Sequence, residues 1–396
     1  AEVFDVEGRQ VRVTHPDRVV FPSLGLTKRD LVAYYLTVSD GALRGVRGRP
    51  MILKRYVKDV EHEAFFQKRV PDNRPPWVAT AELTYRRGTS AEEVVVTDAA
   101  SLAWVVNLGC VDLNPHPVQA ADLDRPDELR IDLDPVPGVA WSQIVDVAML
   151  VRDVLAEHGI VGWPKTSGSR GFHVYARIEP EAAYPQVRSA AQTVAREVER
   201  RAPHLATAQW WKEERDGVFV DFNQNAKDRT VASAWSVRPT PDARVSMPLT
   251  WDEVPSADPA AFTLATAPHL WAQRGDAWAG MDEHSGSLAS LLDLAAEMGP
   301  APKPPRETGR ARKPLVEVAR SASEDEARAA LEEWRAAHPA VAAKLEARDV
   351  LVDRMRGRSS LWYRVRVNLE HVPREDRPEQ EPLIVDYDPW GGVRDE

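Results

Sequence analysis

The stretch Leu-Arg-Ile-Asp-Leu-Asp-Pro at residues 129–135 decides how the rest of the chain is interpreted. Its alternation of apolar and polar residues predicts a β-strand, in which residues two apart share a face, so Asp132 and Asp134 should project together. Like charges this close repel, and divalent cations with oxygen ligands are the usual compensation. Pro135 ends the strand and leaves both carboxylates near its C-terminal edge, where open α/β sheets build their sites. Two solvated aspartates in a turn are the alternative for an isolated Asp-x-Asp, so other motifs must decide.

The composition is that of a globular protein with room for two domains: 396 residues, 43% hydrophobic and 28% charged. A single cysteine, Cys110, excludes a disulfide framework and a Cys-rich zinc module. No stretch approaches the roughly 20 apolar residues of a membrane span and no signal-peptide pattern is present, so we expect a cytoplasmic, nucleoid-associated protein without membrane partners. The net charge is -10, but residues 44–74 hold nine Lys and Arg against four acids. A locally basic surface of this kind suits binding to a phosphate backbone.

Two later motifs supply further polar groups. The loop from Ser167 to Gly171 contains two glycines, two hydroxyls and Arg170, which suits backbone N–H groups that cradle phosphates, although a plain hairpin turn is the alternative. His173 follows on the returning strand and can reach the same cavity. Another apolar strand, residues 218–222, carries a third acid, Asp221, and Arg238 follows an apolar run in a position suited to a phosphate oxygen.

The N-terminal region shows two basic features. Thr27 and Asp30 have the spacing of a capping box and predict the start of a helix. Arg18 and Lys28 flank this turn and could bind a phosphate near the helix N-terminus, or they could be solvated surface charges. Phe65 and Phe66 are adjacent aromatic residues among basic ones, a pattern that suits stacking on an unpaired base. The alternative is that one of the two rings is part of the hydrophobic core.

Three of these motifs occur in the order and spacing of the archaeo-eukaryotic primase superfamily: Asp132-Leu-Asp134-Pro, Ser167-Gly-Ser-Arg-Gly-Phe-His173-Val-Tyr and Val220-Asp221-Phe-Asn-Gln-Asn. The sequence most resembles the polymerase domain of bacterial ligase D, the non-homologous end-joining enzyme, and its stand-alone relatives. Four N-terminal segments also resemble that family: Pro16-Asp-Arg18-Val, Thr27-Lys28, Lys54-Arg55 and Ala64-Phe65-Phe66-Gln-Lys68. The likeness covers about residues 3–285.

The resemblance implies an α/β (α+β) primase-polymerase core, with a central sheet that carries the acidic metal site and an N-terminal DNA-binding subregion. We expect this domain to span residues 1–298, followed by a Pro-rich basic linker at 299–314 and a small α/β appendage of unknown role at 315–396. Within the appendage, the sequence predicts a helix capped by Ser323, a second helix to about Asp353 and a strand from Leu361 to Leu369.

The resemblance also implies roles for individual residues. The catalytic residues, which would bind two Mn²⁺ or Mg²⁺ ions, are Asp132, Asp134 and Asp221. The nucleotide-binding residues, for an NTP or dNTP substrate, are Lys54, Asn114, His116, Ser167, Gly168, Ser169, Arg170, His173 and Arg238. The DNA-binding residues are Arg18, Lys28, Arg55, Phe65, Phe66 and Lys68, of which the first two match positions that hold a downstream 5′-phosphate.

Two departures from the family pattern matter. The phosphate loop more often has Gly-Lys where this chain has Ser169-Arg170, which keeps the charge and changes its geometry. The family's sugar-contacting histidine matches either Asn114 or His116, so the choice between rNTP and dNTP stays open.

The predicted function is template-dependent polymerisation: addition of rNTPs or dNTPs to a primer 3′-hydroxyl in gapped or broken duplex DNA with a 5′-phosphate, for DNA repair, gap filling and end joining. The sequence contains no Lys-x-Asp-Gly motif of a nucleotidyl-transferring ligase, so we expect a separate DNA ligase as functional partner. A primase that starts chains de novo is one alternative, disfavoured because primases often carry a zinc module. A non-catalytic bridge between DNA ends is the other, and the intact set of acids argues against it.

Overall fold

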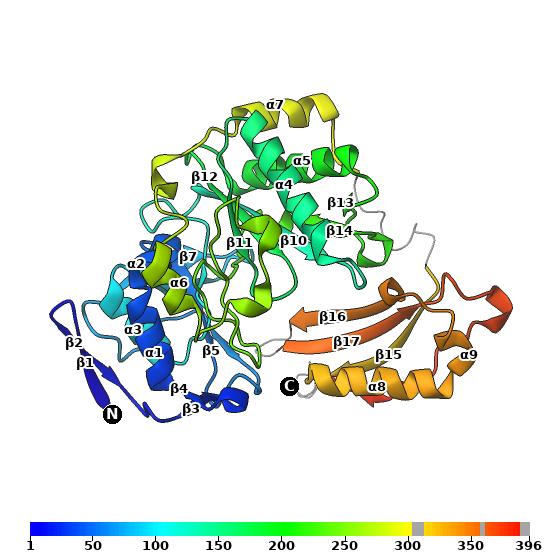
Figure 1. The fold of residues 1–396 in the computed structure, drawn as a ribbon, viewed down its shortest axis with the longest axis horizontal. Coiled ribbons are helices and arrows are strands. Elements are labelled where there is room, and N and C mark those ends of the chain that lie inside the picture. Colours follow the sequence, from blue (N-terminus) through cyan, green and yellow to red (C-terminus); the bar gives the residue numbers. More distant parts are fainter. Residues whose placement is uncertain (303–312, 357–360, 389–396) are drawn as a thin grey trace. The chain divides into compact units, whose positions relative to one another are not determined.

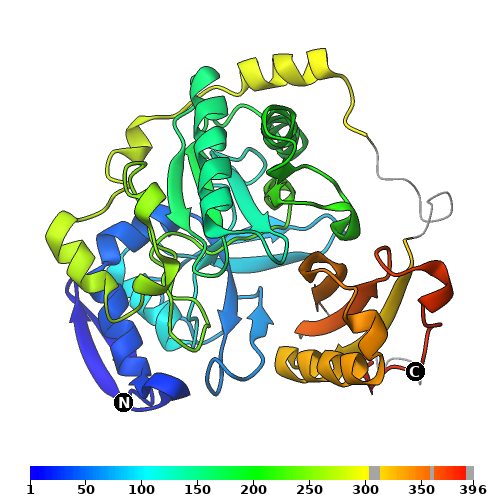
Figure 2. The same ribbon diagram turned by 45° about the vertical axis from the view of Figure 1, so that its right-hand side comes forward.

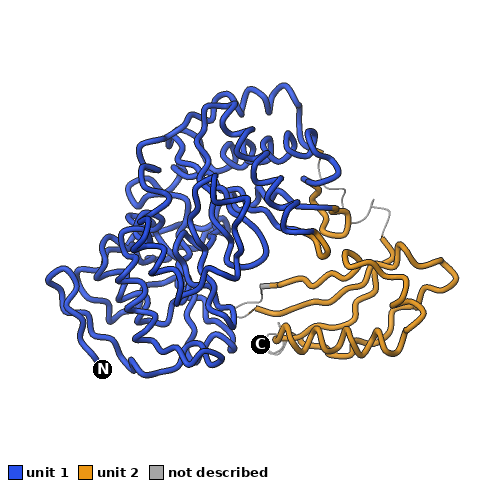
Figure 3. The backbone as a smooth tube through the Cα atoms, in the orientation of Figure 1, with its two compact units in different colours: residues 1–135, 140–208, 217–301 blue, residues 136–139, 209–216, 302–396 orange. Residues whose placement is uncertain are grey.

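The computed structural model describes residues 1–302, 313–356 and 361–388, which form two compact units. Unit 1 contains residues 1–135, 140–208 and 217–301, and unit 2 contains residues 136–139, 209–216 and 302–396 (Figure 3). Most of the expected basic linker lies outside the described residues. Helices and strands are mixed throughout, which confirms the α/β fold class.

The N-terminal part of unit 1 combines small sheets with three helices (Figure 1). Strands β1 and β2 pair as an antiparallel hairpin, and the helix predicted to begin at Thr27 and Asp30 is confirmed. Its helices are α1 (Lys28–Thr37), α2 (Ser39–Val46) and α3 (Ala99–Asn107), which pack on one another. Its strands are β1 (Glu2–Val6), β2 (Arg9–Val13), β3 (Val19–Phe21), β4 (Leu26–Thr27), β5 (Pro50–Arg55), β6 (Phe65–Gln67), β7 (Ala79–Thr84), β8 (Ser90–Val95) and β9 (Asn114–Pro115). The largest sheet here has the order β6-β5-β8-β7, with β9 paired to β5.

The second sheet of unit 1 has the strand order β11-β12-β10-β14-β13. Its strands are β10 (Glu128–Pro135), β11 (Trp163–Thr166), β12 (Phe172–Arg177), β13 (Ala206–Thr207) and β14 (Val218–Asp221). Only the β13/β14 pair of this sheet is parallel, and its other strand pairs are antiparallel. In antiparallel pairs, residues directly opposite one another bring their side chains together on one face.

The strand β10 alternates as predicted. Leu129, Ile131 and Leu133 are at most 1% exposed, whereas Asp132 and Asp134 lie on the other face. Leu133 is paired with Phe172, whose ring packs 4.7 Å from that of Trp141 at the start of α4 (Trp141–Glu157). The apolar face of the sheet is therefore its helical face.

Two long helices cover that face. Helices α4 and α5 (Tyr184–Arg201) pack against each other and both contact β10 (Figures 1 and 2). Two further helices, α6 (Ala267–Arg274) and α7 (Ala289–Met298), complete unit 1, and α7 packs on α5. The acids of β10 consequently project from the face opposite α4 and α5.

Unit 2 is a four-stranded sheet of order β16-β17-β15-β18 with helix α8 packed on it. Its elements are β15 (Leu315–Ser321), α8 (Glu324–Ala337), α9 (Pro339–Ala342), β16 (Val350–Arg356), β17 (Leu361–Asn368) and β18 (Val385–Asp386). The helix capped by Ser323 and the strand near 361–369 are confirmed. The predicted second helix is present as α9 but ends at Ala342 and not near Asp353, because residues from Val350 onward pair with β17 as a strand.

A buried carboxylate organises the sheet of unit 2. Asp353 is 8% exposed and is paired with Arg364, Arg366 and, at 3.1 Å, with Lys212 of the segment 209–216. Lys212 also donates to the carbonyl of Val352. Burial alone would raise the pKa of Asp353, but these cations lower it, so the acid remains ionised in the sheet. Among the described residues of either unit, no helix is long and apolar enough to cross a membrane.

Candidate functional site

Four polar side chains form a row across the second sheet of unit 1. Asp132 is paired with His173 on one side and with Asp221 on the other, and His173 is paired with Lys165 of β11. His173 Nε2 lies 3.4 Å from Asp132 Oδ1, and Lys165 Nζ lies 2.6 Å from His173 Nδ1. The strand register therefore brings together two of the three predicted acids and the predicted phosphate-binding histidine.

Asp132 lies in a largely desolvated position. Burial raises the pKa of its carboxyl group to about 6, although the neighbouring cations Lys165 and Arg238 act in the opposite direction. A divalent cation placed beside this carboxyl group would favour its ionised form.

The other two acids are held by protein partners. Asp134 is about half exposed and has Arg170 at 3.7 Å, and Asp221 accepts hydrogen bonds from the Asn223 N–H at 2.7 Å and from Gln224 Nε2 at 3.0 Å. Across residues 1–302, 313–356 and 361–388, no three His, Cys, Asp or Glu side chains are placed so as to hold a metal ion. The donor set nevertheless fits Mn²⁺ or Mg²⁺, because it consists of carboxylate oxygens aligned on one face by strand register.

The loop between β11 and β12 depends on its two glycines. Gly168 has a φ of 70°, and a Cβ there would clash with Arg238; a Cβ at Gly171 would clash with the carbonyl oxygen of Leu133. Ser167 Oγ accepts hydrogen bonds at 3.1 Å from the N–H groups of both Ser169 and Gly171. The loop therefore packs closely against β10, and two of its N–H groups donate hydrogen bonds to the Ser167 hydroxyl oxygen.

Arg238 also contacts this loop. Its Nη1 donates to the carbonyl of Ser167 at 3.0 Å, and its Nε lies 3.7 Å from Asp112 Oδ2. Asp112 also accepts hydrogen bonds from Lys54 Nζ at 3.2 Å and Asn114 Nδ2 at 3.1 Å. Burial alone would raise the pKa of Asp112, but Lys54 and Arg238 lower it, so the carboxylate orients both cations.

Asp112 and Lys165 are the site residues that sequence reasoning missed. The segment 111–113 alternates Val, Asp and Leu, which could have indicated a buried acid, and Lys165 is a single cation within an expected strand. Of the two candidates for contact with the sugar, Asn114 belongs to the cluster around Asp112. His116 does not: it is 1% exposed and its Nε2 contacts Glu93 at 2.9 Å, so it is placed as a core residue.

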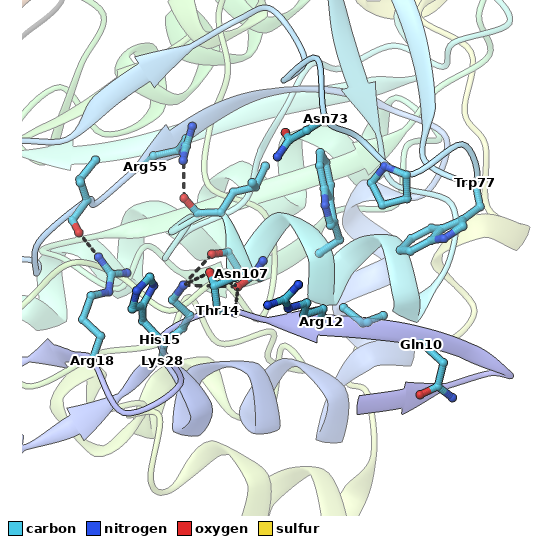
Figure 4. Close-up of a pocket in the computed structure, with 15 residues that line it drawn as sticks. Gln10, Arg12, Thr14, His15, Arg18, Lys28, Arg55, Asn73, Trp77 and Asn107 are labelled. Carbon is cyan, nitrogen blue, oxygen red and sulfur yellow. Dashed lines mark hydrogen bonds between the residues drawn. The ribbon is translucent and has the colours of Figure 1, made fainter. Parts of the chain in front are cut away.

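A second feature of unit 1 is a pocket of about 880 Å³ beside α1 and α3, in which basic side chains gather (Figure 4). Its cations are Arg12, Arg18, Lys28 and Arg55, accompanied by His15, and none of its lining residues, all of them described, is acidic. Arg18 Nη1 donates to the carbonyls of Tyr56, Val57 and Lys58. Lys28 Nζ donates to the Asn107 carbonyl at 2.9 Å. The structure thus places three predicted DNA-binding residues around one cavity that suits an anion.

Lys28 is not the solvated surface cation that most lysines are. It is 5% exposed, and burial, reinforced by Arg18 and Arg55, lowers its pKa to about 8. A terminal phosphate is already mostly in its doubly charged form at pH 7, since its second pKa is about 6.

We therefore expect the preference for DNA carrying a 5′-phosphate to weaken as the pH rises from 7 to 9.5. In the DNA-free protein Lys28 loses its proton over this range, and phosphate binding must then be accompanied by protonation of Lys28. The matched variant Lys28→Arg keeps its charge and should show a flatter profile. Dissociation constants for gapped DNA with and without the 5′-phosphate, measured at each pH, check this. Identical slopes for both proteins would show that Lys28 does not contact the phosphate.

Strand β6 places the two aromatics beside both basic clusters. Phe65 is paired with Arg55 of the pocket and Phe66 with Lys54 of the Asp112 cluster. Phe65 is 45% exposed, whereas Phe66 is half-buried. Lys68 Nζ lies 3.5 Å from the centre of the Tyr85 ring. The two clusters are thus connected through adjacent residues of β5, and an exposed aromatic ring lies beside the pocket.

Unit 1 is thus a mixed α/β domain with a row of polar side chains, two of them acidic, across its second sheet and a separate basic pocket. The family described as LigD, primase-polymerase domain, matches residues 27–278. The chain belongs to this family, which confirms the resemblance seen in the sequence.

Individual relatives support the same family assignment. The multifunctional non-homologous end joining DNA repair protein LigD of Mycobacterium tuberculosis H37Rv is 34% identical over 274 residues, 65% of this chain and 35% of the relative. The bifunctional non-homologous end joining protein LigD of Bacillus subtilis is 31% identical over 260 residues, 65% of this chain and 42% of the relative. The chain therefore spans less than half the length of these relatives.

The fold is shared with a solved structure, the polymerase domain of Mycobacterium tuberculosis ligase D in complex with DNA. The TM-score is 0.66 at 30% identity, covering 69% of this chain and 99% of that domain.

Proposed function

We propose that this protein is a template-dependent polymerase that adds rNTPs or dNTPs to a primer 3′-hydroxyl in gapped or broken duplex DNA, in the repair of DNA ends. The observation that carries the proposal is the register of β10, which pairs Asp132 with His173 on one side and Asp221 on the other. The names of the relatives, which refer to end joining and DNA repair, support this context.

The acids are assigned to metal binding. Asp132, Asp134 and Asp221 would hold Mn²⁺ or Mg²⁺, which, when bound as a pair, favours ionisation of an attacking hydroxyl and neutralises a leaving pyrophosphate. His173, Arg238 and the Ser167 loop border the same face and would bind the triphosphate, while Asp112 keeps Lys54 and Arg238 directed at it. Asn114 is the proposed contact to the sugar.

The basic pocket is assigned to DNA. Arg18, Lys28 and Arg55 would hold the 5′-phosphate on the far side of a gap, and Phe65 would stack near the unpaired template base. This pocket is also the observation that favours a second candidate function, a DNA-end-binding module without catalysis. The need for a separate ligase stays a prediction.

Nucleotide incorporation distinguishes these functions. On a 5′-phosphorylated one-nucleotide gap, we expect the full chain to incorporate labelled rNTPs or dNTPs in Mn²⁺ or Mg²⁺, with a chelator abolishing incorporation. Binding to the gap without incorporation under any metal would favour the end-binding module. Incorporation on a single-stranded template without a primer would instead indicate a primase.

A further inference from the structure

The basic pocket of unit 1 is larger than a phosphate group requires. Its volume of about 880 Å³ lies near the upper end of the range for sites that enclose a whole organic ligand. Arg18 and Lys28, the proposed contacts to a terminal phosphate, lie at one end of the pocket, whereas Gln10 and Trp77 lie at the other (Figure 4). The end that contains Trp77 therefore has no assigned occupant.

The pocket is elongated along strand β2. Gln10, Arg12 and Thr14 line it from alternate positions on this strand and just after it. Residues two apart on a strand share a face and are about 7 Å apart, so these three positions span roughly 14 Å. Helix α3, which packs on β2, contributes Trp104 and Asn107 to the same pocket. The pocket is therefore a groove between β2 and α3.

An indole ring lies at the end of the groove far from Lys28. Trp77 is half-buried, and the Arg9 guanidinium lies 5.3 Å from the centre of its ring. Arg9 is ion-paired with Asp98, the N-cap residue of α3, and does not itself line the pocket. The ring is thus supported from outside the groove. A planar aromatic ring held in this way is a platform on which any nucleobase can stack.

Another cation lies between the two ends of the groove. Arg12 is exposed and lies between Lys28 and Trp77 (Figure 4). Its position on the strand is about 7 Å from that of Thr14, whose hydroxyl oxygen lies 3.4 Å from Lys28 Nζ. Successive phosphates of a nucleic acid strand have a similar separation. Two positions for phosphates and one for a base therefore follow one another along the groove.

We propose that this groove binds the 5′-phosphorylated end of a DNA strand as unpaired nucleotides. The terminal phosphate lies between Arg18 and Lys28, the next phosphate lies at Arg12, and a base stacks on Trp77. The inference rests on the proposed function, which places a 5′-phosphate in this pocket, and extends it to strand ends that are frayed or displaced. None of the lining residues is acidic, so the groove does not repel the second phosphate. A paired end would instead keep its bases in the stack of its own duplex.

Removal of the bases tests the stacking. The probe is a gapped duplex whose downstream strand ends in two unpaired nucleotides with a 5′-phosphate, and its partner probe has abasic residues at these two positions. We expect the full chain to bind the first probe about 5- to 150-fold more tightly, the range for one stacked base. Trp77→Ala should bind both probes equally. Equal wild-type affinities, or a difference that persists in Trp77→Ala, would overturn the proposal.

The matched control is Trp251→Ala. Trp251 is also half-buried, has the Arg152 guanidinium 5.6 Å from its ring centre and lies outside the groove. This variant should keep the wild-type difference between the two probes. Loss of the difference here as well would show that the effect at Trp77 is not specific to the groove.

A second test does not depend on a tryptophan variant. A neutral methylphosphonate replaces the phosphodiester between the two unpaired nucleotides of the first probe. We expect this change to weaken binding by the wild-type protein roughly 10-fold, the low end for a charge-assisted hydrogen bond, and to have little effect on Arg12→Gln. An equal effect on both proteins would overturn the assignment of the second phosphate to Arg12.

The groove and the terminal phosphate site can fail separately. If the wild-type protein did not prefer a 5′-phosphate to a 5′-hydroxyl on these probes, the proposed phosphate site would fail, and the groove with it. If it preferred the 5′-phosphate but bound base-containing and abasic ends equally, the phosphate site would stand and only the groove would fail. Both measurements are of binding, so neither depends on catalysis.

Discussion

Replacing Asp132 or Asp134 by alanine should slow primer extension by roughly 10³-fold or more, because several kcal/mol of charge stabilisation depend on the metal that these acids would hold. DNA affinity should stay near the wild-type value, since removing negative charge does not weaken contacts with phosphates. Single-turnover extension and equilibrium binding on the same gapped DNA measure the two effects separately.

A matched control is Asp146→Ala, which removes an exposed aspartate of α4 on the opposite side of the sheet and should leave extension unchanged. Normal primer extension by Asp132→Ala or Asp134→Ala would show that the replaced acid is not needed for catalysis. Loss of DNA binding together with loss of extension would point to misfolding, which circular dichroism and thermal unfolding detect.

The second large effect is expected at the basic pocket. Arg18→Ala should weaken binding to a gap carrying a 5′-phosphate by about 10- to 100-fold, while binding to the same gap with a 5′-hydroxyl changes little, because a charge-assisted hydrogen bond is worth about 1.5–3 kcal/mol. Arg18 also donates to three backbone carbonyls, so Arg18→Lys, which keeps the charge, should retain part of the preference.

The control for this prediction is Arg200→Ala, at an exposed position on α5 where the arginine side chain is 67% exposed. It should reduce affinity for both DNA substrates slightly and equally, as loss of a distant charge does. If Arg18→Ala behaved like Arg200→Ala, the pocket would not be a phosphate site. Neither outcome depends on catalysis, so this test separates DNA-end recognition from polymerisation.

The sequence was most informative where structure is local. Alternation along residues 129–135 predicted which side chains of β10 share a face, and the spacing of Thr27 and Asp30 predicted the start of α1. Both depend on residues at most a few positions apart, so nothing distant could override them.

Long-range pairing explains what sequence reasoning did not predict. The side chain of Lys165 meets His173 only because β11 and β12 are in register, and Asp112 meets Arg238 across 126 residues of chain. In unit 2, the Ala-, Glu- and Arg-rich run before Val350 favours a helix by intrinsic propensity, but pairing with β17 makes the following residues a strand. Local propensity contains no information about these partners.

The loop from Ser167 to Gly171 was predicted from its composition, and its role in phosphate binding stays a prediction. The close contacts that require its two glycines, and the hydrogen bonds from Ser169 and Gly171 to Ser167 Oγ, were not foreseen. Hydrogen bonds within the loop to Ser167 leave Arg238 and His173, which lie outside the loop, as the proposed phosphate-binding residues.

The most direct test of the central claim is a template exchange on the 5′-phosphorylated one-nucleotide gap. Four gaps that differ only in the unpaired template base are each offered all four labelled nucleotides, with Mn²⁺ and with Mg²⁺. The account predicts that the full chain adds the complementary nucleotide in each case and that Asp132→Ala adds none. Addition that ignores the template base, or equal addition by Asp132→Ala, would contradict it.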